Sequence, residues 1–256
     1  MDLLADTHVH FYPDHDLGAL VSGAVSRLRQ AAGAPDAPCA LFLTEGKGYQ
    51  AFHQLKSGEL SLPDGFELEA SPESAGLYLH HEGNRTLLVA GRQIVAAERV
   101  EILALGLENE AEDGQPAADV IASADAAGAI PVLAWAPGKW MFARAEVVDR
   151  LIRHSGDVLR LGDSSLRCKG WPLPKPMAAA RMPVLAGSDP LPFPGDESAA
   201  GSYGVRITLN LDEAAPVSSL RRALRDETTP ISRIGQRNSA VQMARRMAAH
   251  RKHKSA

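Results

Sequence analysis

The sequence predicts a TIM-like β/α barrel of about seven parallel strands, with a β-hairpin insertion and a basic C-terminal helix. Three observations support this fold class. Short apolar runs typical of buried strands alternate with segments that have apolar residues at helical spacing. The length of 256 residues suits a single α/β barrel domain. Finally, two histidines end the first apolar run, and functional groups of barrels gather where strands end.

The predicted elements follow one another along most of the chain. The strands are expected within residues 2–11 and at 39–44, 100–106, 130–135, 158–161, 183–187 and 205–211. Helices are expected at 17–32, 117–127 and 144–154, because their apolar residues recur every three or four positions. Gly33 and Gly128 directly follow the first two of these helices, as glycine commonly does at a helix end.

Residues 66–97 have a different pattern, with short β-type runs broken by Ser71-Pro72, by Glu82-Gly83-Asn84 and by Gly91. Such breaks are typical of hairpins. We therefore expect a hairpin-rich insertion at 46–98, within a barrel domain that spans residues 1–216. Residues 217–256 are expected to form a basic helical segment and tail.

The last 40 residues are strongly basic. Residues 217–256 contain ten Lys and Arg against two acidic residues, a net charge of +8, so residues 1–216 carry −12 of the total of −4. Residues 239–250 have apolar side chains near helical spacing, which predicts an amphipathic helix against the barrel and a frayed tail from Arg251. A nucleic-acid partner is not favoured, because no aromatic residue follows Tyr203 and no nucleic-acid motif is present.

Composition narrows the class of protein. An apolar fraction of 45% and a charged fraction of 23% are ordinary for a globular protein. No apolar run approaches the ~20 residues that span a bilayer, and no secretory signal leads the sequence, so we expect a cytoplasmic protein without a membrane partner. Cys39 and Cys168 are too few for a disulfide framework.

His8 and His10 form the first candidate site. Because side chains alternate along a strand, both imidazoles point to the same side and can reach one ion. Imidazole nitrogen suits one divalent metal ion such as zinc, manganese or iron. The alternative is a pair of histidines at a strand end that bind nothing.

Over residues 1–204 the order of motifs resembles the polymerase and histidinol phosphatase (PHP) family. The stretch Asp-Thr-His-Val-His at 6–10 matches the family's opening His-x-His. At four later landmarks the sequence departs from the family pattern. These are Thr-Glu-Gly at 44–46 for Thr-Asp-His, Gly-Arg-Gln-Ile at 91–94 for Gly-x-Glu-Ile, Ala-Trp-Ala-Pro-Gly at 134–138 for Ala-His-Pro-Gly, and Gly-Ser-Asp-Pro-Leu at 187–191 for Gly-Ser-Asp-x-His. The resemblance implies a distorted barrel of about seven strands that holds metal ions for phosphoester hydrolysis.

The resemblance implies one metal site made of His8, His10, Gln93 and Asp189, in which an amide replaces a family carboxylate. Gly46, Trp135 and Leu191 stand where the family has histidine ligands, so a three-metal centre is not expected. Glu45 and Glu101 remain candidates for oxygen ligands or for a general base. The amidohydrolase barrels also begin with His-x-His, but they need histidines on middle strands, and 130–135 and 158–162 contain none.

Lys139 is the third candidate for a catalytic role. It lies with Trp135 and Trp140 just beyond a strand end, where the resemblance would place the mouth of the site. Its ammonium group could replace a lost metal by neutralising a phosphate or carboxylate oxygen, while a tryptophan packs against the substrate. The alternative is an ordinary turn whose indoles belong to the core.

Arg160, Asp163 and Arg167 surround the next strand end. They could add contacts to an anion, or they could form a salt-bridged loop without a ligand.

Two functions follow from these residues. The first is a metal-dependent, phosphoesterase-like hydrolase that acts on a phosphorylated or other anionic small molecule by metal-activated water. The second is a catalytically degenerate PHP-like barrel that binds a ligand or partner without hydrolysis. The retained His-x-His and aspartate favour the enzyme, and the replaced ligand positions favour the binding protein. The pattern makes no prediction of oligomeric state.

Overall fold

The structure, a computed structural model, describes residues 1–255. The strands are β1 Asp2–Val9, β2 Cys39–Glu45, β3 Phe66–Ala70, β4 Gly76–His81, β5 Asn84–Val95, β6 Glu101–Leu105, β7 Ile130–Ala134, β8 Arg160–Ser164, β9 Leu185–Gly187, β10 Tyr203–Thr208 and β11 Ile231–Gly235. The helices are α1 Leu17–Ala32, α2 Ala51–Ser57, α3 Ala117–Ala126, α4 Ala143–Ser155, α5 Lys175–Ala178, α6 Pro216–Arg225 and α7 Ala240–Lys254.

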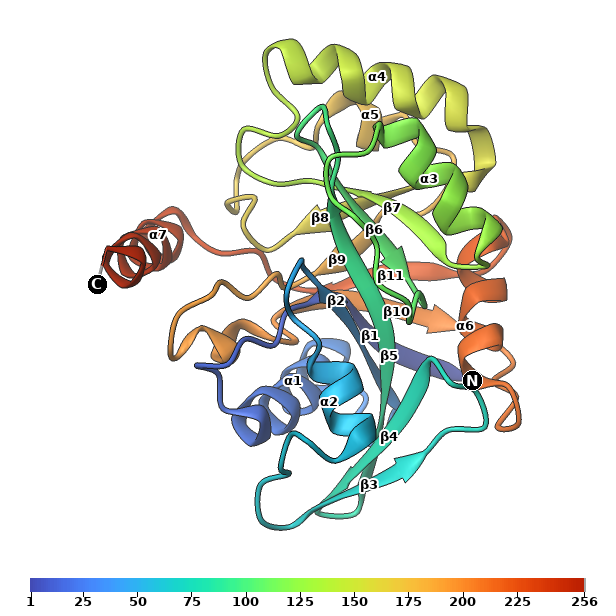
Figure 1. Ribbon diagram of the computed structural model, residues 1–256, viewed down its shortest axis with the longest axis vertical. Coiled ribbons are helices and arrows are strands. Elements are labelled where there is room, and N and C mark those ends of the chain that lie inside the picture. Colours follow the sequence, from blue (N-terminus) through green and yellow to red (C-terminus); the bar gives the residue numbers. More distant parts are fainter. Residues whose placement is uncertain (256) are drawn as a thin grey trace.

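The strands form one mixed sheet that curls into a nearly closed barrel (Figure 1). Its main path runs β11-β10-β1-β2-β5-β6-β7-β8-β9. Strand β9 returns to β1, where the amide of Asp189 donates to the carbonyl of His8 at 2.9 Å and the Thr7 hydroxyl donates to the Ala186 carbonyl at 3.0 Å. The first and last strands of the predicted barrel therefore lie side by side.

The expectation of about seven parallel strands is wrong. The main path contains nine strands, and β6 is antiparallel to both β5 and β7. Strand β6 runs antiparallel to β5 because the connection between them, residues 96–100, is short. Within it the amide of Ala96 donates to the carbonyl of Val100 at 3.0 Å. Parallel neighbours need a crossover of about a dozen residues, so a tight turn returns the chain antiparallel. Strands β10 and β11 extend the sheet beyond β1, also in antiparallel pairs.

Hairpins occupy the region in which the sequence predicts them. Strands β3, β4 and β5 pair antiparallel in order. Glu82 and Gly83 connect β4 to β5 with φ values of 48° and 75°, as a two-residue hairpin turn requires. Strand β5 is also a barrel strand, because its residues 86–92 pair parallel with β2.

Two hydrophobic clusters fill the structure. One lies between α1 and strands such as β1, β2, β4 and β5, and the other between α3, α4 and strands β6 to β8. Helix α1 has the predicted bounds because the Asp16 carboxylate caps the amide of Ala19 at 2.8 Å and Gly33 ends the helix at φ 62°. In Figure 1, α3 and α4 lie along one end of the molecule and α1 and α2 along the other.

The C-terminal segment is more ordered than predicted. Helix α7 begins at a capping box of Ser239 and Gln242 and continues to Lys254, so the expectation of a frayed tail from Arg251 is wrong. Met243 and Met247 pack against the second cluster. Helix α7 projects from one side of the barrel in Figure 1. No helix in the described part of the chain is long and apolar enough to cross a membrane.

Candidate metal centre

His8, His10 and Asp189 converge at one end of the barrel although about 180 residues separate them in sequence. The Nε2 atoms of the two histidines are 3.0 Å apart, and each lies 3.6 Å from Oδ1 of Asp189. All three side chains are buried. The close approach depends on Gly187, where a Cβ atom would lie 2.2 Å from Cβ of His8.

These three residues fit a metal ion. Ligand atoms held about 2.1 Å from a tetrahedral ion are about 3.4 Å from one another, close to the separations in this cluster. Burial, followed by the neighbouring His8, lowers the pKa of His10 to about 3, so its imidazole is neutral at pH 7 and keeps a lone pair for a metal. The group can therefore hold one divalent ion, and its donors do not specify which one.

A second layer of polar groups holds the three side chains in place. The hydroxyl of Ser164 donates to Oδ2 of Asp189 at 3.0 Å, which leaves Oδ1 for the cluster. Asp189 itself has a φ of 54°, in the left-handed region that residues other than glycine rarely adopt and that is frequent at functional sites. Tyr12 stacks on His10 with ring centroids 5.4 Å apart. Outer contacts of this kind orient metal ligands.

Asp6, on β1, supports the same end of the barrel. Its buried carboxylate accepts hydrogen bonds from both the amide and the hydroxyl of Ser188, from the amide of Gly201 and from the amide of His8. Burial raises the pKa of Asp6 to about 6, although these four hydrogen bonds act in the opposite direction. The side chain thereby joins β1 to the segment that carries Asp189.

Gln93 lies next to the cluster. Its Oε1 atom is 2.9 Å from Nε2 of His8. An amide oxygen in this place can contact a cation without adding charge.

Exchanging this amide for a carboxylate should strengthen metal binding. We expect Gln93→Glu to lower the dissociation constant of the metal by about tenfold, because the added negative charge lies beside the two buried histidines, although residue 93 itself is half-buried. Titration of the protein with metal in competition with a chelator measures this constant. Gln54→Glu, on the exposed side of α2, is the control that adds the same charge away from the cluster. Equal affinities in the two variants would show that Gln93 does not contact the metal.

Glu45 lies at the end of β2 and lines a pocket together with Gln93. The pocket has a volume of about 480 Å³, and Lys47, Arg92, Glu110 and Glu112 also line it. Glu45 accepts a hydrogen bond from the amide of Phe52 at 2.9 Å and lies 3.4 Å from Arg92. Burial raises the pKa of Glu45, while the amide of Phe52 and the charge of Arg92 lower it in part.

Glu101 and Lys139 form an ion pair, with 3.0 Å between Nζ and Oε1. Glu101 begins β6 opposite Ala134, the last residue of β7, so the pair lies at the same end of the barrel as the histidines. Trp135 and Trp140 are buried in the second hydrophobic cluster, and the indole nitrogen of Trp140 donates to the Ala134 carbonyl at 2.9 Å. The interpretation of these indoles as core residues is therefore correct.

The strand end after β8 is a salt-bridged loop. Arg167 binds both oxygens of the buried Asp163, at 2.7 and 2.6 Å. Arg160 is buried at the start of β8, where its guanidinium donates to the carbonyls of Leu224 and Arg225, each at 2.7 Å. Its contacts are thus with the end of α6, and not with an anion near the histidines.

Arg246 of α7 is a supporting residue that sequence reasoning missed. It donates to both oxygens of Asp196, at 2.8 and 2.5 Å, and to the backbone carbonyl of Asp189 at 3.0 Å. This contact joins the basic helix to the loop that carries a candidate ligand. Nothing in the sequence near residue 246 indicates it, because the partners are at least 50 residues away.

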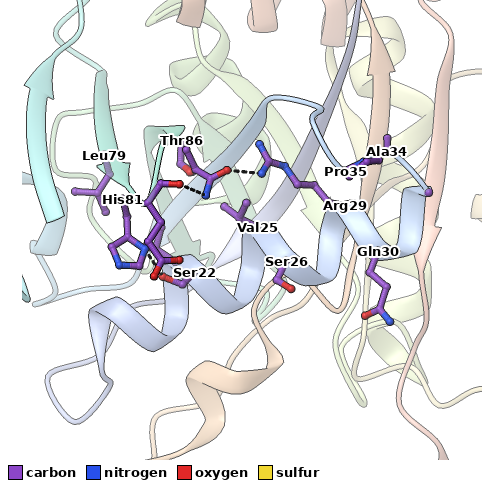
Figure 2. A pocket seen from close by; sticks show the side chains of 14 residues that line it. Ser22, Val25, Ser26, Arg29, Gln30, Ala34, Pro35, Leu79, His81 and Thr86 are labelled. Carbon is purple, nitrogen blue, oxygen red and sulfur yellow. Dashed lines mark hydrogen bonds between the residues drawn. The ribbon is translucent and has the colours of Figure 1, made fainter. Parts of the chain in front are cut away.

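A larger pocket of about 580 Å³ lies between α1 and the β4–β5 hairpin (Figure 2). It adjoins the first residues of β5, opposite the end of the sheet where Glu45 and Gln93 lie. Ser22 bonds to Nδ1 of His81 at 3.1 Å, and Arg29 bonds to Asn84 (Figure 2). These hydrogen bonds pair four of its polar side chains. Among the described residues the group that could hold a metal is His8, His10 and Asp189, so the candidate chemistry remains there.

No family model and no curated protein matches the sequence. The fold is similar to that of PsfC from Pseudomonas syringae PB-5123, with a TM-score of 0.55, 15% identity, and coverage of 99% of this chain and 98% of that chain. It is also similar to the lesion-specific endonuclease PfuEndoQ from Pyrococcus furiosus, with a TM-score of 0.53 and 14% identity over 90% of this chain. The chain spans 58% of that endonuclease. At these identities the likeness concerns the fold alone.

Proposed function

We propose that this protein is a metal-dependent hydrolase that acts on a phosphorylated or other anionic small molecule. The observation that carries the proposal is the convergence of His8, His10 and Asp189, whose donor atoms lie within 4.8 Å of one another. Two imidazoles and one carboxylate, held at strand ends beside a pocket, are a donor set typical of hydrolytic metal sites.

A divalent ion bound there would supply Lewis acidity for a substrate oxygen and for the attacking water. The chain itself supplies the remaining groups. Glu101 and Glu45 are the candidate bases, and the Glu101–Lys139 pair adds a cation that can face a developing negative charge. The wall formed by Glu110 and Glu112 disfavours an anion, so we expect the charged end of the substrate at the histidine side of the pocket.

The fold neighbours add support of a general kind. PfuEndoQ is named as an endonuclease, a class of enzyme that cleaves phosphodiester bonds. The resemblance to PHP proteins at residues 6–10 points to phosphoester chemistry as well. We favour a small molecule over a polynucleotide because the pocket beside Gln93 has a volume of about 480 Å³, in the range of small-ligand sites.

The test combines metal analysis with a hydrolysis assay. Protein purified without chelator should contain about one equivalent of a divalent metal. It should hydrolyse members of a panel of small phosphate esters, with release of phosphate from monoesters and of a monoester and an alcohol from diesters. Removal of the metal should abolish release, and its return should restore it. Folded protein without stoichiometric metal would instead favour a binding protein, and cleavage of duplex DNA alone would contradict a small-molecule substrate.

Lys139→Met tests the proposed cation. The change keeps most of the apolar stem and removes the charge, so we expect binding of inorganic phosphate to weaken by about 1–3 kcal/mol while metal content stays the same. Competitive inhibition by phosphate measures this affinity. Lys56→Met, which removes the same charge from the Lys56–Glu108 pair, is the matched control. Equal phosphate affinity in wild type and Lys139→Met would remove Lys139 from the site.

A further inference from the structure

A cluster of cations lies on the opposite face of β8 from the metal centre. Side chains alternate along this strand, so that Ser164 reaches Asp189 while its neighbour Asp163 meets the hydroxyl of Tyr203 at 2.9 Å. On the Asp163 side, the loop after β8 and the end of β11 enclose a pocket of about 320 Å³. This pocket is therefore separate from the candidate active site.

The pocket is strongly positive. Four cations line it: Arg167 and Lys169 from the loop after β8, Arg233 from β11 and Arg237 from the segment that follows. Asp163 is the carboxylate that contacts this group, and it is fully buried beneath it, with Arg167 at 2.6 Å and Arg233 at 3.6 Å. Four positive charges against one negative charge leave a local excess of +3, in a chain whose net charge is −4.

Two of these cations have no acidic partner among residues 1–255. Lys169 donates to the side-chain oxygen of Gln236 at 3.2 Å. Arg237 donates through Nη1 to backbone carbonyls, among them that of Cys168 at 3.2 Å. These neutral acceptors hold the two side chains near the pocket without neutralising them. Like charges brought together repel, so such an arrangement indicates a negatively charged ligand.

The buried floor of the pocket is fixed in a form that suits an anion. Asp163 has both oxygens occupied by Arg167, so its charge is compensated before any ligand arrives. Tyr203 points its hydroxyl at Asp163, and burial, followed by the charge of Asp163, raises the pKa of Tyr203 to about 12. The phenol therefore stays protonated and adds no negative charge near neutral pH.

We propose that this pocket is a binding site for a small ligand bearing a phosphate or diphosphate group, distinct from the metal centre. Lys169, Arg233 and Arg237 line the pocket from three segments, and their donors match an oxyanion with several acceptor oxygens. Arg167 adds positive charge, but its guanidinium is engaged by Asp163 and by backbone carbonyls. The four cations line one pocket of about 320 Å³, a volume in the range of small-ligand sites. A small phosphorylated molecule therefore fits better than the backbone of a nucleic acid.

Calorimetric titration with inorganic pyrophosphate tests this site. To exclude the metal centre, the titration is run on the wild-type protein after chelator treatment and on His8→Ala, and both should bind pyrophosphate with the same affinity. Lys169→Glu should raise the dissociation constant at least about tenfold, because it exchanges an attractive charge for a repulsive one. Arg245→Glu makes the same change at an exposed position of α7 outside the pocket and should change the constant less than about twofold.

Arg233→Gln provides a second variant, and it should weaken binding in the same direction as Lys169→Glu. Loss of pyrophosphate binding in His8→Ala would place the anion at the metal centre and overturn the proposal. So would equal weakening by Lys169→Glu and Arg245→Glu, or the absence of saturable binding at millimolar pyrophosphate. Tight binding of an oligonucleotide that pyrophosphate does not displace would assign the surface to nucleic acid instead.

Discussion

Replacing His8 by alanine is expected to abolish stoichiometric metal binding and, with it, hydrolysis. The substitution removes one of the three donors that lie within 4.8 Å of one another, and two remaining ligands cannot hold a divalent ion tightly. We expect metal content to fall from about one equivalent to less than about a tenth, and the hydrolytic rate to fall by at least about 100-fold. Elemental analysis and phosphate release measure the two effects.

The substitution should leave the fold intact. Alanine keeps the Cβ atom that packs against Gly187, and the backbone carbonyl of residue 8 still accepts from the amide of Asp189. His80→Ala is the matched control, because His80 pairs with Glu69 at 2.5 Å and lies outside the cluster. Unchanged metal content in His8→Ala, or an equal loss in His80→Ala, would contradict the assignment of the site.

The parts of the fold that depend on local patterns are predictable from the sequence. Helix α1 lies at the predicted residues because its apolar spacing and both of its end signals are local. Strand direction is not local. The apolar run near residues 100–106 identifies β6 as a buried strand, but a buried parallel strand and a buried antiparallel strand have the same pattern. The short connection before β6 is the signal that indicates its direction.

Helix α6 has a sequence signal for a helix, but the basic composition of the C-terminal segment obscures it. Pro216 occupies its first turn, and Val217, Leu220 and Leu224 follow at helical spacing. Strand β11 is harder to predict, because Ser232 and Arg233 lie side by side in a five-residue strand and break the alternation of apolar residues.

The candidate site also has residues that local patterns predict and residues that they do not. His8 and His10 are two residues apart on a strand, so their shared direction follows from the strand alone. Asp189 and Gln93 join them only through the family motifs, since no local rule brings residues 10 and 189 together. The contact of Arg246 with the Asp189 carbonyl depends on how α7 packs, and it has no sequence signal.

Replacing Asp6 by asparagine is expected to destabilise the protein by about 2–4 kcal/mol, a large part of the free energy of unfolding of a typical domain. All four of its hydrogen-bond partners are donors, and two of them, the Ser188 hydroxyl and the Gly201 amide, point to Oδ2. An amide offers one acceptor oxygen, so its NH₂ group must face donors whichever way the side chain turns. The buried position admits no easy rearrangement, because Asp6 has no exposed surface.

Chemical denaturation measures this loss, and Asp2→Asn on the same strand is the control. Asp2 is exposed and bonds to the hydroxyl of Thr208 at 2.7 Å, so its substitution should cost less than about 0.5 kcal/mol. Because Asp6 joins β1 to Ser188, we also expect Asp6→Asn to weaken metal binding by loosening Asp189 relative to His8 and His10. Equal stability of Asp6→Asn and Asp2→Asn would show that the carboxylate does not hold the barrel closed at this end.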